Sequence, residues 1–220
     1  MKIRFVCRGK VGALQENYEC DGEGLIVFGF GGLGEVNYEK ELKGESHFFE
    51  QVAGLSKEGK NVVVCGCVTD TRGLKRKSAI VAEKGRICGV SDMLRVTDGE
   101  VNAGAGLRLY ETSMGRMGVI VGEDIQYSET IRAAVLCGSD FIVCPYGQVR
   151  DSFLQTLLRV YAYSYGAPIL FCGDGYAYLV SPSGTIEFAS PQDAVVEFEN
   201  VKEYHLIETR QRGIRNAPLL

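Results

Sequence analysis

This chain has no long apolar run, no excess of positive charge and only two histidines. No run approaches the roughly 18 consecutive apolar residues that span a bilayer. The opening residues MKIRFVCRGK place charges where a signal peptide needs an apolar segment. We therefore expect a cytoplasmic protein with no membrane segment. The formal net charge of −4 makes nucleic acid a poor candidate partner. His47 and His205 are distant in the sequence, which gives little support for a Ser-His or Cys-His catalytic arrangement.

The remaining composition is that of an ordinary globular protein. Hydrophobic residues make up 45% of the chain and charged residues 24%. The length of 220 residues is enough for one sizeable core. We find no internal repeat, low-complexity segment or linker that would divide the chain, so we expect one domain, residues 1–220.

Eight cysteines are present, mostly within apolar runs such as VVVCGCV and FIVCP. Free thiols in such runs usually behave as small buried hydrophobes, so we do not expect disulfides. The pair Cys65 and Cys67 could bind a metal, but it has no partner pair and no nearby histidine. We expect no metal site and no cofactor.

Short β-branched runs alternate with stretches of helical spacing, which favours βαβ units. The helical stretches are 45–59, with Phe48, Phe49, Val52 and Leu55 on one face, then 128–139 and 152–166. In the second, Ser128 is placed to cap a helix whose Ile131, Ala134 and Val135 face inward. The segments KSAIVAEKGRICGV and AYLVSPSGTIEFAS are typical of hairpins that turn at EKG and PSG. Together these elements predict a two-layer or four-layer α/β sandwich.

Three other patterns have two readings each. GFGGLGE, residues 29–35, loosely matches the spacing G-x-G-x-x-G, but no helical pattern follows it directly, so dinucleotide binding is weakly supported. A basic cluster, most simply a solvated hairpin loop, could also hold a small anion. The alternating tyrosines at the end of 152–166 favour packing or a subunit contact. The basic cluster consists of Arg72, Lys75, Arg76 and Lys77, and the alternating tyrosines are Tyr161, Tyr163 and Tyr165.

The order of these pieces resembles the nitrilase, or carbon-nitrogen hydrolase, superfamily. The resemblance rests on GLIVFGF, EKGRICGVSDM, the run from AGAGLRLYETS to IVCPYG, the run from LRVYAYSYG to IEFAS, and the ending RQRGIRNAPLL. Together these stretches cover most of the chain. The resemblance implies an αββα-type sandwich that associates into homo-oligomers. Its first amphipathic helix would be shortened here, because only residues 8–24, rich in glycine, separate the first two strands.

Members of that family act on non-peptide C–N bonds with a glutamate, a lysine and a cysteine. The thiolate attacks the amide or nitrile carbon, the carboxylate moves protons, and the ammonium stabilises the oxyanion. The family's V-V-F-P-E stretch matches a segment ending at Phe30, and its G-x-x-x-G-x-x-x-K spacing ends at Met93. Its cysteine position falls on Gly122 in MGVIVGEDIQYSE. The resemblance therefore implies that all three catalytic groups have been replaced.

We expect a non-catalytic binding or scaffold homologue. Its partners would be a second copy, a paralogous active enzyme, or a small amide or carboxylate ligand. The candidate binding residues are Phe30, Met93, Gly122, Glu123 and Tyr146. The alternative is an active C–N hydrolase in which Glu123 and Cys144 have taken over the chemistry. Asp124 is expected to be structural, capping the helix that follows it.

Overall fold

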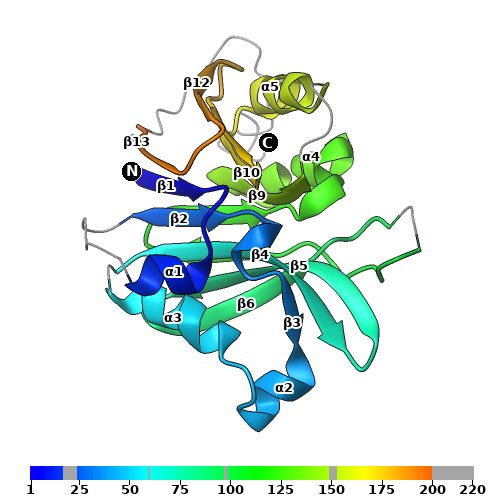
Figure 1. Cartoon of the computed structure of the whole chain (residues 1–220). Coiled ribbons are helices and arrows are strands. Elements are labelled where there is room, and N and C mark those ends of the chain that lie inside the picture. The colour runs from blue at the N-terminus through cyan, green and yellow to red at the C-terminus, as the bar shows by residue number, and fades with distance from the viewer. Residues whose placement is uncertain (17–23, 59, 97–98, 149–152, 200–220) are drawn as a thin grey trace, which may run out of the picture.

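The computed structural model describes residues 1–16, 24–58, 60–96, 99–148 and 153–199. Two β-sheets lie face to face, with helices on both outer sides (Figure 1). α1 (Val11–Glu16) and α3 (Phe48–Glu58) cover one sheet, and α4 (Ser128–Leu136) and α5 (Phe153–Tyr165) cover the other. The predicted αββα sandwich is confirmed, and the first helix is short, with six residues.

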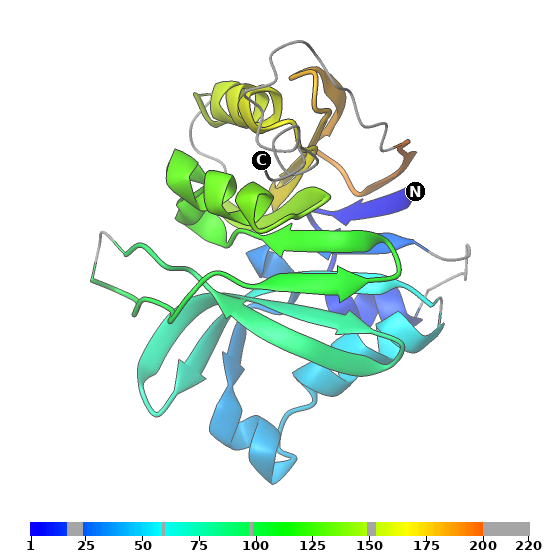
Figure 2. The ribbon, with the colours of Figure 1, turned by 180° about the vertical axis from the view of Figure 1, so that it is seen from behind.

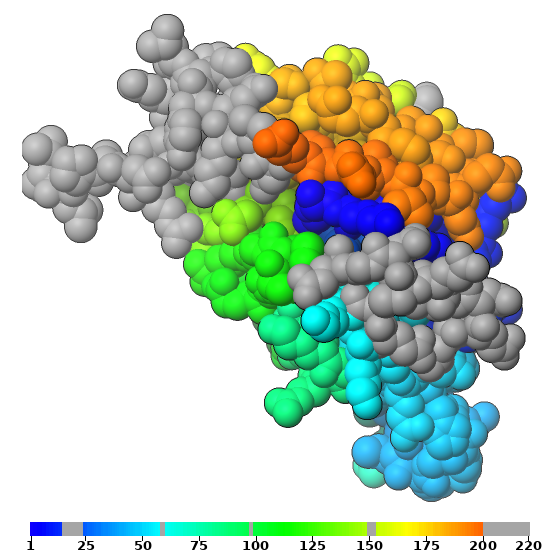
Figure 3. Space-filling model, turned by 90° about the vertical axis from the view of Figure 1, so that its left-hand side faces the viewer, coloured from blue at the N-terminus to red at the C-terminus, as the bar shows by residue number. Residues whose placement is uncertain are grey.

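The first sheet runs in the order β13-β1-β2-β4-β5-β6. β1, β2 and β4 are parallel, whereas β13, β5 and β6 join antiparallel. Figure 3 shows β13, in orange, against β1, in blue, although they come from opposite ends of the described chain. The strands are β1 (Lys2–Val6), β2 (Leu25–Phe28), β4 (Val62–Thr71), β5 (Leu74–Glu83), β6 (Arg86–Asp92) and β13 (Ala194–Glu197), with β3 (Glu35–Asn37) paired to the far end of β4.

The second sheet runs in the order β12-β11-β10-β9-β8-β7, with parallel strands β8, β9 and β10 at its centre. Its strands are β7 (Leu109–Thr112), β8 (Gly115–Val119), β9 (Phe141–Gln148), β10 (Ile169–Asp174), β11 (Tyr176–Val180) and β12 (Ile186–Ser190). In Figure 2 the green hairpin β7–β8 lies beside β6 of the other sheet. A hydrogen bond of 2.9 Å between Ser91 Oγ and Tyr110 Oη joins β6 to β7.

Three apolar clusters hold the layers together. Inward-facing side chains such as Val27 and Val64 meet Val143 between the sheets. Alternate residues of the same strands, such as Val63, pack outward against α1 and α3, and the second sheet packs in the same way against α4 and α5. Because the central strands are buried on both faces, their sequences are continuous apolar runs.

The helix predictions are mostly confirmed. In α3, Val52 and Leu55 are fully buried, while Phe48 and Phe49 are partly buried against the same core. Ile131, Ala134 and Val135 of α4 are buried as predicted. Two short elements were not predicted, β3 and α2 (Tyr38–Lys43). No helix within the described ranges is long and apolar enough to cross a membrane.

Two local predictions are wrong. Ser128 does not cap α4 but is its first residue, and the cap position is Tyr127, which makes no side-chain capping bond. The basic cluster is not a loop, since the turn after β4 contains only residues 72–73 and Lys75, Arg76 and Lys77 all lie on β5. The predicted turns at EKG and PSG are confirmed between β5 and β6 and between β11 and β12.

Candidate functional site

The three positions singled out by the sequence resemblance meet at one point between the sheets. Phe30 begins the short 3-10 turn η1 (Phe30–Gly32) after β2, Met93 directly follows β6, and Gly122 begins the turn η2 (Gly122–Gln126) after β8. A Cβ atom built on Gly122 would lie 3.2 Å from Met93 Sδ and 3.4 Å from Phe30 Cζ. The first sheet thus supplies two side chains that converge on a bare backbone position beside the second.

Gly122 has a backbone conformation that favours glycine. Its φ of +56° lies in the left-handed region, where a side chain costs about 1–2 kcal/mol because Cβ approaches the following carbonyl oxygen. The sharp change of direction from β8 into η2 is made at this residue. Gly122 therefore allows the backbone conformation at the start of η2 but brings no reactive side-chain atom to it.

The ring of Phe30 is surrounded by glycines from different strands. A Cβ on Gly66 of β4 would collide with Phe30 Cδ1, and one on Gly147 of β9 would lie 3.5 Å from Phe30 Cδ2. Together with Gly122, these bare positions leave the space that the ring occupies. Phe30 is 8% exposed and Met93 2%, so apolar atoms fill the centre where the sheets converge.

Two carboxylates, the buried Asp124 and the half-buried Asp174, fix the segments that carry these side chains. Asp124 accepts hydrogen bonds from the backbone N–H groups of Leu94, at 2.7 Å, and Arg95, at 2.9 Å. Burial raises the pKa of Asp124, and these two bonds act in the opposite direction. The expectation that Asp124 caps the following helix is wrong, because it instead ties η2 to the segment after Met93. On the other side, Asp174 of β10 accepts from Gly31 N at 2.7 Å and fixes the turn η1.

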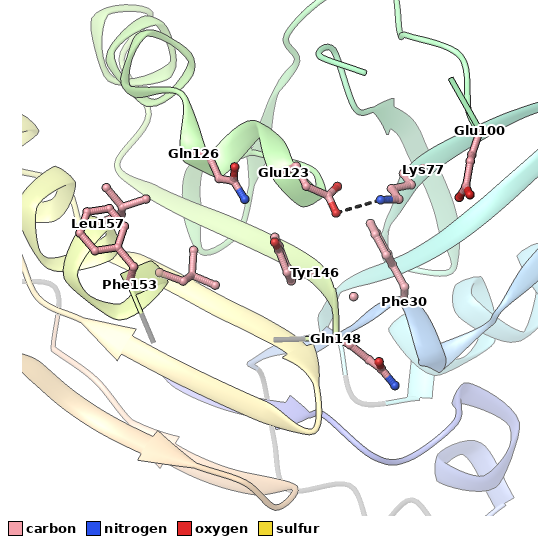
Figure 4. A pocket seen from close by; sticks show the side chains of 11 residues that line it. Phe30, Lys77, Glu100, Glu123, Gln126, Tyr146, Gln148, Phe153 and Leu157 are labelled. Atoms are coloured by element: carbon pink, nitrogen blue, oxygen red, sulfur yellow. Dashed lines mark hydrogen bonds and ion pairs between the residues drawn. The ribbon is translucent and has the colours of Figure 1, made fainter. Parts of the chain in front are cut away.

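A cavity of about 810 Å³ adjoins this filled centre (Figure 4). Phe30 forms part of its wall, η2 and β9 supply polar groups, and α5 supplies an apolar end. The described residues that line it are Phe30, Lys77, Glu100, Glu123, Gln126, Tyr146, Gly147, Gln148, Phe153, Leu154 and Leu157. Of the predicted binding residues, Phe30, Glu123 and Tyr146 therefore line the cavity, whereas Met93 and Gly122 lie in the packed centre beside it.

Lys77 and Glu123 form an ion pair in the cavity wall, with 2.8 Å between Lys77 Nζ and Glu123 Oε1. Their side chains are 22% and 34% exposed. The other carboxylate oxygen, Glu123 Oε2, is buried and has no hydrogen-bond partner among the described residues. Lys77 was predicted to lie in a solvated loop, whereas it lies on β5 and lines the cavity. Met93 N donates to Lys77 O at 2.9 Å, which places Lys77 beside one of the three converging positions.

Cys144 occupies a different environment from Glu123. Its side chain is fully buried in the cluster between the second sheet and its helices, and it is not among the described residues that line the cavity. Burial raises the pKa of its thiol well above the ordinary value, and the nearby charges of Asp124 and Glu123 raise it further. Because the thiolate is the nucleophilic form, this thiol is poorly suited to attack at neutral pH.

The other candidate residues lie away from the cavity. His47 pairs with Glu50 at the surface, at 2.9 Å, and His205 is outside the described residues. Cys65 and Cys67 are fully buried, and the described residues contain no group of three or more His, Cys, Asp or Glu placed to hold a metal ion. Tyr161 is buried and donates to Gln126 O at 3.1 Å, so it supports the η2 turn from α5.

No protein-family model and no curated protein sequence matches the chain. Solved structures do. A cysteine-to-alanine mutant of the amidase from Nesterenkonia AN1, from the nitrilase superfamily, superposes with a TM-score of 0.72 at 14% identity over 89% of this chain and 88% of that one. Nit3 of Saccharomyces cerevisiae, a member of branch 10 of that superfamily, gives 0.71 at 13% identity, again over 89% and 88%.

A carbon-nitrogen hydrolase from Helicobacter pylori G27 gives a TM-score of 0.69 at 19% identity, over 88% of this chain and 86% of that one. Identities this low show a shared fold, and a fold does not by itself specify a reaction. The superpositions extend over 86–89% of the chains compared. This chain therefore has the αββα sandwich fold of the nitrilase, or carbon-nitrogen hydrolase, superfamily.

Proposed function

We propose that the chain is a non-catalytic homologue of the carbon-nitrogen hydrolases that binds a small ligand. The observation that carries the proposal is the convergence of Phe30 and Met93 on Gly122. These are the positions that the sequence resemblance assigns to the family's glutamate, lysine and cysteine. A phenyl ring cannot accept a proton, a thioether carries no positive charge, and glycine has no side chain to attack with.

The packing also supports loss of the reaction, because the space at the three converging positions is filled rather than empty. The ring of Phe30 fills the space between Gly66, Gly122 and Gly147, and Met93 is almost fully buried beside it. No water or substrate carbon can occupy the same volume. Removing one member of a catalytic unit already costs several powers of ten in rate, so replacing three leaves nothing of that mechanism.

The adjoining cavity supports the binding role. It combines an apolar end with a few polar groups, which is the usual composition of a small-molecule site. From the sequence resemblance we also propose that residues 1–220 form one domain that associates with a second copy or with a paralogous active enzyme.

The alternative, an active hydrolase using Glu123 and Cys144, has less support. Glu123 lines the cavity, whereas Cys144 packs between β9 and the outer helices with a raised thiol pKa. A nucleophile and its base must lie within hydrogen-bond reach of one reacting centre.

Thiol labelling separates the two functions. We expect iodoacetamide at pH 7.5 to label Cys137, which is exposed, and to leave Cys144 unmodified in the folded protein, as read by peptide mass mapping. Cys137 serves as the matched control on the same chain. Two results together would contradict the proposal: Cys144 reacts with iodoacetamide at least as fast as Cys137, and an aliphatic amide or nitrile protects Cys144 from this reaction.

A further inference from the structure

The cavity has two chemically distinct ends. In Figure 4, Lys77, Glu123 and Glu100 gather at one end, and Phe153 and Leu157 of α5 lie at the other. Gln126, Tyr146 and Gln148 line the space between them. A ligand that fills it must therefore be polar at one end and apolar at the other.

The polar end presents a positive and a negative charge side by side. Lys77 Nζ and Glu123 Oε1 are 2.8 Å apart, and both side chains keep some exposure. A ligand that carries a single charge would be attracted by one member of this pair and repelled by the other. A ligand with an ammonium and a carboxylate on one carbon can face both with the opposite charge, without separating Lys77 from Glu123.

Glu123 has further capacity to accept a hydrogen bond. Its Oε2 atom has no partner among the described residues, and a buried carboxylate oxygen left in this way costs free energy. The terminal torsion of a glutamate is broad, so the carboxylate can turn this oxygen toward a donor in the cavity. Glu100 lines the same end and adds a second negative charge, which favours an ammonium there.

The apolar end would gain from being covered. Phe153 is 58% exposed, and Leu157 lies one turn further along the same face of α5. Covering them with an aliphatic or aromatic group removes apolar surface from water, worth roughly 25 cal/mol per Å².

We propose that the cavity binds a free α-amino acid with an apolar side chain. The ammonium faces Glu123, the carboxylate faces Lys77, and the side chain extends toward α5. This inference rests on the proposed binding function and names the ligand class. Charge-assisted hydrogen bonds are about twice as strong as neutral ones, so the zwitterion is favoured over a neutral primary amide of the same shape.

Isothermal titration calorimetry of the full chain tests this with five probes of matched shape. L-Leucine carries both charges, 3-methylbutylamine only the ammonium, 4-methylpentanoate only the carboxylate, and 4-methylpentanamide neither. Glycine lacks the side chain. We expect L-leucine to bind at least about tenfold more tightly than each of the other four, since each lacks at least one of the three interactions.

Variants of Lys77 and Glu123 test which side chain binds each charged group of the ligand. Lys77→Gln should weaken L-leucine about tenfold without weakening 3-methylbutylamine, which Lys77 repels, whereas Glu123→Gln should weaken L-leucine and bring it level with 4-methylpentanoate. Lys75→Gln is the matched control, because Lys75 is on the same strand and pairs with Glu35 at 3.0 Å outside the cavity. It should bind L-leucine as the wild type does.

Three results would overturn the inference: no heat of binding with L-leucine, tighter binding of 4-methylpentanamide than of L-leucine, or equal effects of Lys77→Gln and Lys75→Gln. Circular dichroism and thermal unfolding of each variant show whether it is folded. None of these results bears on hydrolysis, which is measured separately, so failure of the ligand class is distinguishable from failure of the proposed function.

Discussion

At the scale of single residues, Phe30 is held in place by contacts from both sheets. Its ring needs the space of three missing side chains, at Gly66, Gly122 and Gly147. These glycines come from three different strands or strand ends, so each has its own backbone neighbours. The ring is therefore held by the geometry of both sheets rather than by one loop.

Removal of this ring should destabilise the protein strongly. We expect Phe30→Ala to lower the free energy of unfolding by about 3 kcal/mol, because it leaves a void in a nearly buried site. Phe153→Ala is the control, since Phe153 is 58% exposed and its truncation should cost about 0.5 kcal/mol or less. Urea unfolding of both variants measures the difference. Equal losses would show that the ring of Phe30 is not packed as described.

Asp124 gives a prediction about pH. Burial raises its pKa in the folded protein above the unfolded value of about 3.9. The folded state then binds the proton more readily, so the contribution of Asp124 to stability is fully present below the unfolded pKa and is lost as pH rises through the folded pKa. Asp124→Asn removes this titration while keeping one acceptor for the N–H groups of Leu94 and Arg95.

The comparison is made by urea unfolding from pH 3.5 to pH 7. The free energy of unfolding of wild type relative to Asp124→Asn should fall as pH rises across this range. A difference that rises with pH instead would mean that the hydrogen bonds from Leu94 and Arg95 outweigh burial and hold the pKa below its ordinary value.

At the level of elements, the β5–β6 hairpin places Lys77 opposite Met93 through a feature that the sequence does not reveal. The turn at EKG was predicted, and pairing Glu83 with Arg86 follows from it. Regular counting from that pair would put Arg76 opposite Met93. A bulge between Val81 and Ala82 shifts the register by one, so that Met93 instead faces Lys77. No pattern in the sequence marks this bulge, and a one-residue shift moves every side chain to the other face.

For the helices, the buried faces could be predicted from the sequence, whereas the partners of polar side chains could not. The buried faces of α3 and α4 follow from apolar spacing, which reports burial directly. The partner of a polar side chain does not follow from spacing. Asp124 lies three residues before the cap position of α4, and its carboxylate reaches across to the backbone after β6. These hydrogen bonds are tertiary contacts, because they join residues about 30 positions apart in the sequence.

For the whole molecule, the alternation of strands and helices predicts an α/β sandwich of two or four layers, because strands buried on both faces and helices buried on one leave clear apolar patterns. The choice of the αββα arrangement followed from the family resemblance. The cavity could be predicted only in part. Phe30, Glu123 and Tyr146 follow from the sequence resemblance, whereas its apolar end on α5 depends on how that helix lies over the second sheet. Structures with 13–19% identity share the fold, but a shared fold does not specify a reaction.

Hydrolysis of C–N bonds is the measurement that tests the central claim most directly. Purified protein at high concentration is incubated with a panel of aliphatic amides and nitriles, and ammonia release is compared with a protein-free blank and with the Nesterenkonia amidase. The account predicts release indistinguishable from the blank for every compound, because Phe30, Met93 and Gly122 carry no acid, base or nucleophile. Turnover that is abolished by Glu123→Gln or Cys144→Ala would contradict it and would establish the chain as an enzyme.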